Sequence, residues 1–267
     1  MRRKSLNPGR IFAGVRRLNL SPSGVWLLVV AVATVTTTAV IAAGVGEDVT
    51  QHNGAATSDP QHLRFFVEHR PTAVIAVARG VTALGAVPVL GILAIVAAAL
   101  LWWKGQRLFV ALAPGIAFGG TGVAVAVTKQ LVGRVRPDLA VRLVSDSEAS
   151  FPSGHAADST ALFVAFGVVV AAVLFRRPLA RVVTVAVALI ASAMVGLSRL
   201  VLAAHWPTDV IAGWAVGLLI GVTISTIAVL AARVAPSNID RPSRVRARVT
   251  WALLARRRGV AARPFAA

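Results

Sequence analysis

The stretch VIAGWAVGLLIGVTISTIAVLAAR, Val210–Arg233, carries no charged residue before its final arginine. A helix needs about 20 consecutive apolar residues to cross a hydrocarbon core of about 30 Å, and this stretch is long enough. The composition agrees, because 57% of the 267 residues are hydrophobic, only 14% are charged, and the mean hydropathy is +0.76. Such a chain is too apolar for a soluble core of ordinary make-up. The sequence therefore predicts an integral membrane protein.

Five more apolar stretches of spanning length precede this one. They are Val25–Val45, Val81–Trp103, Leu108–Val132, Ala156–Phe175 and Val182–Ala203. The first follows a basic segment but is longer than the apolar part of a signal peptide, so we interpret it as a retained span. The predicted fold class is therefore all-α, a bundle of six transmembrane helices.

The spans define three regions. Residues 24–233 are predicted to form the six-span domain, between a basic segment at 1–23 and a basic tail at 234–267. Residues 59–79 mix phenylalanines with charged side chains, which is typical of a short interfacial helix, here placed before the second span.

The basic residues predict the orientation in the membrane. With both termini inside, 20 of the 28 lysines and arginines fall in inner segments, and nine of the ten acids fall elsewhere. The positive-inside rule therefore favours a multi-pass cell-membrane protein with both termini cytoplasmic. The net charge of +18 is spread along the membrane edges, with no basic domain bearing interleaved aromatics, so we expect no nucleic-acid partner.

Polar residues gather near the outer ends of the third to sixth spans. Ionisable groups at mid-membrane depth cost about 2.5 to 3.5 kcal/mol each on insertion scales and are usually functional. The gathered residues are Lys129, Arg134, Arg136, His155, Asp158, Arg199, His205 and Asp209. This pattern predicts one polar site at the extracytoplasmic face.

His205 and Asp209 are spaced to interact in either of two ways. If the last helix begins near Trp206, the spacing of four puts both on one helix face. If Pro207 occupies the first turn, the helix begins after His205 and the pair meets across the helix end. Either contact lets the carboxylate hold one imidazole N–H and leaves the other ring nitrogen free as a nucleophile or base.

The segment Pro152–His155 runs directly into the fourth span. Ser153 is a plausible N-cap, with unpaired backbone N–H groups beyond it that could cradle an anion. Gly154 would let the backbone approach a ligand closely, and His155 could give a proton to a leaving oxygen. The plain alternative is a loop that only caps the helix.

We expect three cations, Lys129, Arg136 and Arg199, to have no acid that neutralises them, although Asp138 lies two residues after Arg136. Guanidinium groups match tetrahedral oxyanions, so a phosphoryl group would neutralise them. We assign the remaining arginines of this face, Arg134 and Arg142, to lipid headgroup contacts.

These residues form three motifs in order, KxxxxxxRP at Lys129–Pro137, PSGH at Pro152–His155 and SRxxxxxHxxxD at Ser198–Asp209. The chain resembles the phosphatidic acid phosphatase type 2 (PAP2) superfamily, in its membrane-integral lipid phosphatase branch, and the motif core spans residues 129–209. The resemblance implies a hydrolase in which His205 is the nucleophile, Asp209 orients it and His155 is the general acid. It also implies phosphate binding by Lys129, Arg136, Ser153, Gly154 and Arg199, a phosphohistidine intermediate, and no metal or other cofactor. Arg134 and Asp158 inherit no role.

The expected substrate is a lipid phosphomonoester or pyrophosphate, whose tail can remain in the bilayer while its phosphate reaches the site. Phosphatidate, phosphatidylglycerophosphate and polyprenyl pyrophosphate are the candidates, and the composition, rich in alanine, valine and arginine, suggests a GC-rich bacterial genome and hence the last of these. The alternatives are a phosphotransferase that passes the phosphoryl group to an acceptor alcohol, a lipid-binding or transport protein without catalysis, and a metal hydrolase that uses His155, His205 and Asp209. Nothing in the sequence indicates an oligomeric state.

Overall fold

The computed structural model describes residues 22–146 and 148–234, which form helices joined by loops, with no strand among them. The predicted basic segment 1–23 falls almost wholly outside them, and the predicted tail 234–267 does so beyond its first residue. The elements are α1 (Pro22–Gln51), the 3-10 helix η3 (Gly54–Ser58), α2 (Asp59–Glu68), α3 (Thr72–Ala83), α4 (Val87–Trp103), α5 (Leu108–Val132), α6 (Gly154–Val173), α7 (Pro178–Val201) and α8 (Pro207–Val234). The all-α prediction is confirmed.

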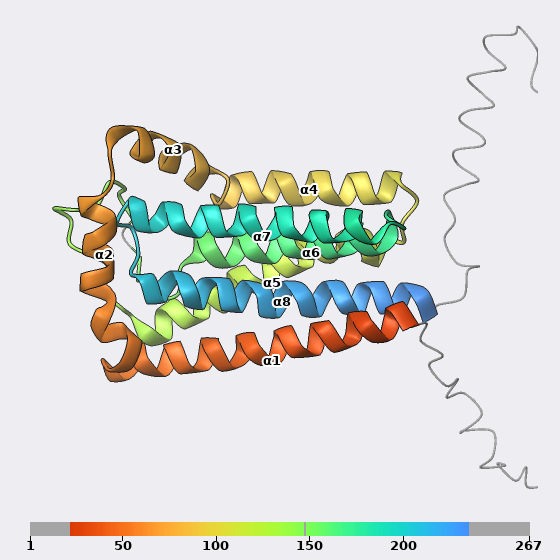
Figure 1. Cartoon of the computed structure of the whole chain (residues 1–267), viewed down its shortest axis with the longest axis horizontal. Helices are drawn as coiled ribbons and strands as arrows, with labels where there is room; N and C mark the ends of the chain where they lie inside the picture. Colours follow the sequence, from red (N-terminus) through yellow and green to blue (C-terminus); the bar gives the residue numbers. More distant parts are fainter. Residues whose placement is uncertain (1–21, 147, 235–267) are drawn as a thin grey trace, which may run out of the picture.

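The long helices run side by side, and both ends of the described chain lie at the same end of the bundle (Figure 1). Five helices in the described part, α1 and α5 to α8, are each long and apolar enough to cross a membrane, and α3 with α4 makes a sixth if that bent pair is one span. Large apolar side chains face outward, and Ile95 and Val187 are 71% and 60% exposed. In a bilayer these chains contact lipid, so outward apolar surface is what a multi-pass protein requires.

The second predicted span, Val81–Trp103, is not one straight helix. It is broken at residues 84–86, and α3 and α4 meet at an angle of 54°. Pro88 stands in the first turn of α4, where its missing N–H leaves no helical bond unmade. A Cβ on Gly85 would lie 2.5 Å from Val195 Cγ1 and 3.0 Å from His155 Cδ2, so only glycine lets the break pack against that histidine.

The predicted interfacial helix at 59–79 is two helices. Figure 1 shows α2 running across the ends of α1, α8 and α7, and α3 packs against α7. The other predicted bounds differ by a few residues at one or both ends, except for Leu108–Val132, which coincides with α5.

Helix α6 is the most buried span, and it packs against α5, α7 and α8. Its contact with α8 is made through glycines. A Cβ on Gly213 would lie 2.7 Å from the Ser153 carbonyl oxygen, and a Cβ on Gly217 would lie 2.5 Å from the Ala157 carbonyl oxygen. Small residues let helix backbones approach closely. The starts of α6 and α8, which carry the predicted catalytic residues, are thereby held together.

Candidate active site

The predicted site residues come together at the end of the bundle where α2 lies. A cavity of about 430 Å³ opens among them. Its wall includes five of the eight predicted residues, Lys129, Arg136, Gly154, His155 and His205. The other three, Ser153, Arg199 and Asp209, are buried directly behind this wall.

His205 and Asp209 meet across a helix end, which is the second of the two predicted geometries. Helix α8 begins at Pro207, so His205 precedes it, and His205 Nδ1 lies 3.4 Å from Asp209 Oδ2. The same carboxylate oxygen accepts the Trp206 backbone N–H at 2.9 Å. The carboxylate is thereby fixed against the imidazole from within the first turn of α8.

The other ring nitrogen of His205 faces a cation. Arg136 Nη1 lies 3.1 Å from His205 Nε2, and because a guanidinium can only donate, Nε2 is the acceptor and the ring proton sits on Nδ1. His205 is 1% exposed, and this burial, reinforced by Arg136 and Arg199 and opposed by Asp209, lowers its pKa to about 4. The imidazole is therefore neutral at pH 7, with a lone pair on the side of the cavity.

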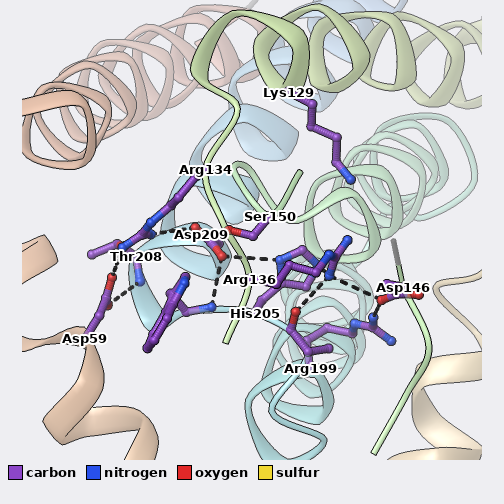
Figure 2. A network of polar contacts seen from close by, with 12 residues as sticks. Asp59, Lys129, Arg134, Arg136, Asp146, Ser150, Arg199, His205, Thr208 and Asp209 are labelled. Atoms are coloured by element: carbon purple, nitrogen blue, oxygen red, sulfur yellow. Dashed lines mark hydrogen bonds and ion pairs between the residues drawn. The ribbon is translucent and has the colours of Figure 1, made fainter. Parts of the chain in front are cut away.

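Two of the predicted phosphate ligands are bridged by a carboxylate. Asp146 Oδ2 accepts Arg199 Nη2 in a very short contact and Arg136 Nη1 at 3.3 Å (Figure 2). Burial opposes the ionisation of Asp146, but the two guanidinium groups outweigh it and the pKa of Asp146 is lowered. We call Arg136, Arg199 and Lys129 the clamp.

The third member of the clamp is also paired. Figure 2 shows Lys129 pointing from its helix toward Arg136 and His205, and its Nζ lies 3.0 Å from Glu148 Oε2. The expectation that no acid neutralises the clamp cations is therefore wrong, because the folded chain brings acids that are distant in sequence into contact with them. Asp146 and Glu148 lie in the segment between α5 and α6, 53 residues before Arg199 in the case of Asp146. Their carboxylates lie against the clamp where phosphoryl oxygens would bind.

Arg134 is not a headgroup contact as predicted. Its guanidinium is mostly buried, with Nη1 2.6 Å from Asp209 Oδ1 and Nη2 2.7 Å from Asp59 Oδ2. Thr208 completes the cluster, because its backbone N–H donates to Asp59 Oδ1 at 3.0 Å and its hydroxyl donates to Asp59 Oδ2. Figure 2 shows this cluster on the side of Asp209 away from the clamp. Arg134 and Asp59 therefore support the carboxylate that supports His205.

The segment before α6 differs from expectation in one detail. Ser153 stands at the N-cap position, as predicted, but its side chain makes no capping hydrogen bond, and within the described ranges its buried Oγ has no partner. Its backbone N–H donates to the Asp209 carbonyl oxygen at 3.0 Å, which joins the starts of α6 and α8. The hydroxyl and the first N–H groups of α6 remain available to an anion.

Asp158, to which the sequence assigns no role, lines the same cavity from α6. The residue is 5% exposed, and its Oδ1 has no hydrogen-bond partner among the described residues. The sequence drew attention to Asp158 because it is an ionisable residue inside a predicted span. In the structure Asp158 and His155 line the same cavity.

The arrangement suits phosphoryl transfer. A buried neutral imidazole with its Nδ1 proton held by a carboxylate is an activated nucleophile. Guanidinium and ammonium groups next to it can stabilise charge on phosphoryl oxygens, and a second histidine in the same cavity can serve the leaving oxygen.

Comparisons with known proteins agree with this chemistry. Residues 107–233 match the PAP2 superfamily. Phosphatidylglycerophosphatase B of Bacillus subtilis (strain 168) is 30% identical over 142 residues, which are 53% of this chain and 68% of that protein. The decaprenylphosphoryl-5-phosphoribose phosphatase of Mycobacterium tuberculosis is 32% identical over 114 residues, 42% of this chain and 56% of its own. The lipid A 1-phosphatase of Rhizobium etli is 36% identical over 125 residues, which are 43% of this chain and 46% of that protein.

The fold has a solved counterpart. The transmembrane PAP2-type phosphatidylglycerolphosphate phosphatase from Bacillus subtilis superposes with a TM-score of 0.66 at 25% identity, over 78% of this chain and 98% of that chain. Family, fold and site thus point the same way. This chain belongs to the PAP2 superfamily and is a multi-pass membrane phosphatase.

Proposed function

We propose that this phosphatase hydrolyses a lipid phosphomonoester or pyrophosphate at the outer face of the membrane, through a phosphohistidine on His205 and without a metal ion. The observation that carries the proposal is the pair of contacts on the buried imidazole, with Asp209 at Nδ1 and Arg136 at Nε2. These contacts leave Nε2 as the nucleophilic atom and aim it at the clamp.

In the first step Nε2 of His205 attacks phosphorus. An N–P bond forms, the bond from phosphorus to the leaving oxygen breaks, and its electron pair stays on that oxygen. His155 takes up a proton from solvent when the anionic phosphate binds beside it, and it gives that proton to the leaving oxygen. The clamp stabilises the charge on the non-bridging oxygens, which take the place of the Asp146 carboxylate.

In the second step a water molecule attacks the phosphorus of the phosphohistidine. The water gives a proton to the now neutral His155, the N–P electron pair returns to Nε2, and inorganic phosphate leaves. His155 is protonated again, so the cycle closes without a cofactor.

The proposed place of the reaction follows from charge. The site lies at the end of the bundle opposite the ends of α1 and α8 that lead to the basic segments (Figure 1). The positive-inside rule supports cytoplasmic termini, and hence an extracytoplasmic site. A lipid is the expected substrate because the relatives are named for phosphorylated lipids. Phosphatidylglycerophosphate, phosphatidate and polyprenyl pyrophosphate are the candidates.

The test is phosphate release by the full chain, purified in detergent with a chelator, from these three lipids. His205→Ala is expected to lower kcat by more than a thousandfold, whereas His62→Ala, a matched change of an exposed histidine on α2, is expected to leave it unchanged. The reaction would also be stopped rapidly with a substrate that carries a radioactive phosphoryl group. Radioactivity on the protein that is labile in acid and stable in alkali would identify the phosphohistidine. Activity in His205→Ala equal to wild type would refute the mechanism, and a phosphorylated product formed from an added alcohol would indicate the phosphotransferase instead.

A further inference from the structure

Asp158 is a buried carboxyl group that neither step above uses. We propose that Asp158 and the adjoining part of the cavity form a subsite for a hydroxyl group on the leaving alcohol, so that the preferred substrate is the phosphomonoester of a polyol headgroup such as glycerol or a sugar. This inference rests on the proposed function, because it takes the site to be a phosphoryl-transfer site.

The first argument is the missing partner. Asp158 lies inside a membrane-spanning helix, where an ionisable side chain without a partner is unfavourable and usually functional. Its Oδ1 is enclosed by the protein and accepts no hydrogen bond from any described residue, and Lys129, a cation of the same cavity wall, is engaged by Glu148. A ligand in the cavity can therefore bond this carboxyl group through its other oxygen, Oδ2.

The second argument is the position in the cavity. The wall near Asp158 is completed by small and apolar side chains of α4 and α5, among them Val87, Gly122, Val125 and Ala126. A Cβ on Gly154 would lie 3.8 Å from Asp158 Oδ2, so the carboxyl group points back toward the start of α6 and the phosphate region. Asp158 and Lys129 are the polar groups of a side of the pocket that is otherwise apolar.

The third argument is the direction of the reaction. In phosphoryl transfer the nucleophile and the leaving oxygen are in line, so the leaving group lies opposite His205, on the side of His155. Asp158 is three residues after His155 on α6, and residues at that spacing share a helix face. Asp158 thus faces the alcohol that departs rather than the oxygens that the clamp holds.

The chemistry of the carboxyl group then selects the alcohol. A hydroxyl group can both donate and accept, so it satisfies Asp158 in either protonation state. A leaving diacylglycerol has no free hydroxyl next to the ester oxygen before cleavage, and a fully ionised leaving phosphate offers only acceptors and would repel a carboxylate. Phosphatidylglycerophosphate, with a free hydroxyl on the reacting glycerol, fits best among the three candidate lipids.

The experiment compares two soluble probes that differ only in hydroxyl groups, glycerol 1-phosphate and propyl phosphate. Their Kd values are measured by thermal shift on the full-length protein in detergent, and kcat/KM is measured in parallel for phosphatidylglycerophosphate and phosphatidate with the same acyl chains. In wild type we expect the hydroxylated member of each pair to be favoured about tenfold or more, as one hydrogen bond to a charged group allows.

The variants are Asp158→Ala and the isosteric Asp158→Asn, with Asp138→Asn in the outer segment as a matched control. Asp158→Ala is expected to remove the preference by weakening only the hydroxylated member, while Asp158→Asn keeps part of it, because a carboxamide still bonds a hydroxyl. Equal loss for both members in both variants would mean that Asp158 only balances the charge of Lys129, and it would overturn the proposal. A wild type without preference would overturn it too. Neither result touches the proposed function, which the His205→Ala comparison tests separately.

Discussion

Arg134 is the side chain whose replacement tests the organisation of the site most directly. It contacts no cavity-lining residue of the clamp and bridges two buried carboxylates, those of Asp209 and Asp59, at 2.6 and 2.7 Å. At these distances and an effective dielectric constant of about 20, each attraction is about 6 kcal/mol before desolvation is subtracted. Removing one partner of a buried ion pair costs about 3 to 5 kcal/mol net. Arg134→Met should therefore destabilise the protein by about that amount.

The catalytic effect should appear in kcat rather than in phosphate binding. Without Arg134, the Asp209 carboxylate keeps, among its contacts with described residues, the Trp206 N–H and the long contact to His205, so it can turn away from the imidazole. We expect kcat to fall about a hundredfold, because misplacing an orienting group has effects of this order, while the inhibition constant of inorganic phosphate changes less than threefold. A general loss of structure would instead weaken phosphate binding as well.

The assay is steady-state hydrolysis of the preferred lipid in detergent, with thermal unfolding of the same samples. Arg64→Met is the matched control, because Arg64 is an exposed arginine of the same helix as Asp59, α2. Asp59→Asn should give an intermediate loss, since it removes one charge and keeps the shape. If Arg134→Met retains kcat within twofold of wild type, the supporting role assigned to this cluster is wrong.

Two further predictions concern the charge state of the site. In an NMR titration, with the signals assigned by His205→Asn, the His205 ring signals should not shift between pH 8 and pH 5, because the pKa of His205 in the folded protein is about 4. This pKa is below the value of about 6.5 for free imidazole, so between about pH 6.5 and pH 4 the unfolded state binds more protons than the folded state. The free energy of unfolding therefore falls as the pH falls through this range. A midpoint near 6.5 would contradict the burial argument. Asp146→Asn should lower the inhibition constant of inorganic phosphate about tenfold, because a neutral amide competes less well for Arg136 and Arg199; an unchanged or higher constant would contradict it.

The spanning helices and the main site residues could be predicted from the sequence because each leaves a local signal. The length of the apolar stretches predicted α5 and α8 as spans. Charged residues in or next to apolar stretches predicted the side chains that meet at the cavity. The alternative starts of α8 could not be separated, because Trp206 and Pro207 allow both. In the structure α8 begins at Pro207, and the Asp209 carboxylate accepts the Trp206 backbone N–H just before the helix.

The partners of the cations could not be predicted, because no local rule places a loop carboxylate. Asp59 and Asp146 reach their arginines across 75 and 53 residues, and the contacts depend on how α2 and the segment before α6 fold back over the bundle. One signal was present in the sequence: nine of ten acids lie outside the inner segments, and buried cations at the outer face need counter-charges. The break in the second span at Gly85 depends likewise on contacts with Val195 and His155 that sequence spacing does not encode.

The Asp146 carboxylate lies between Arg136 and Arg199, so substrate binding exchanges one anion for another at these arginines. An arriving phosphate replaces an anion that the protein already supplies, so the affinity reflects the difference between two anions and not the full attraction of the clamp. The same exchange runs backwards when inorganic phosphate departs, because the returning carboxylate stabilises the emptied arginines. A strongly cationic site can thereby release a dianionic product and stay ready for the next lipid, at the expense of tight binding.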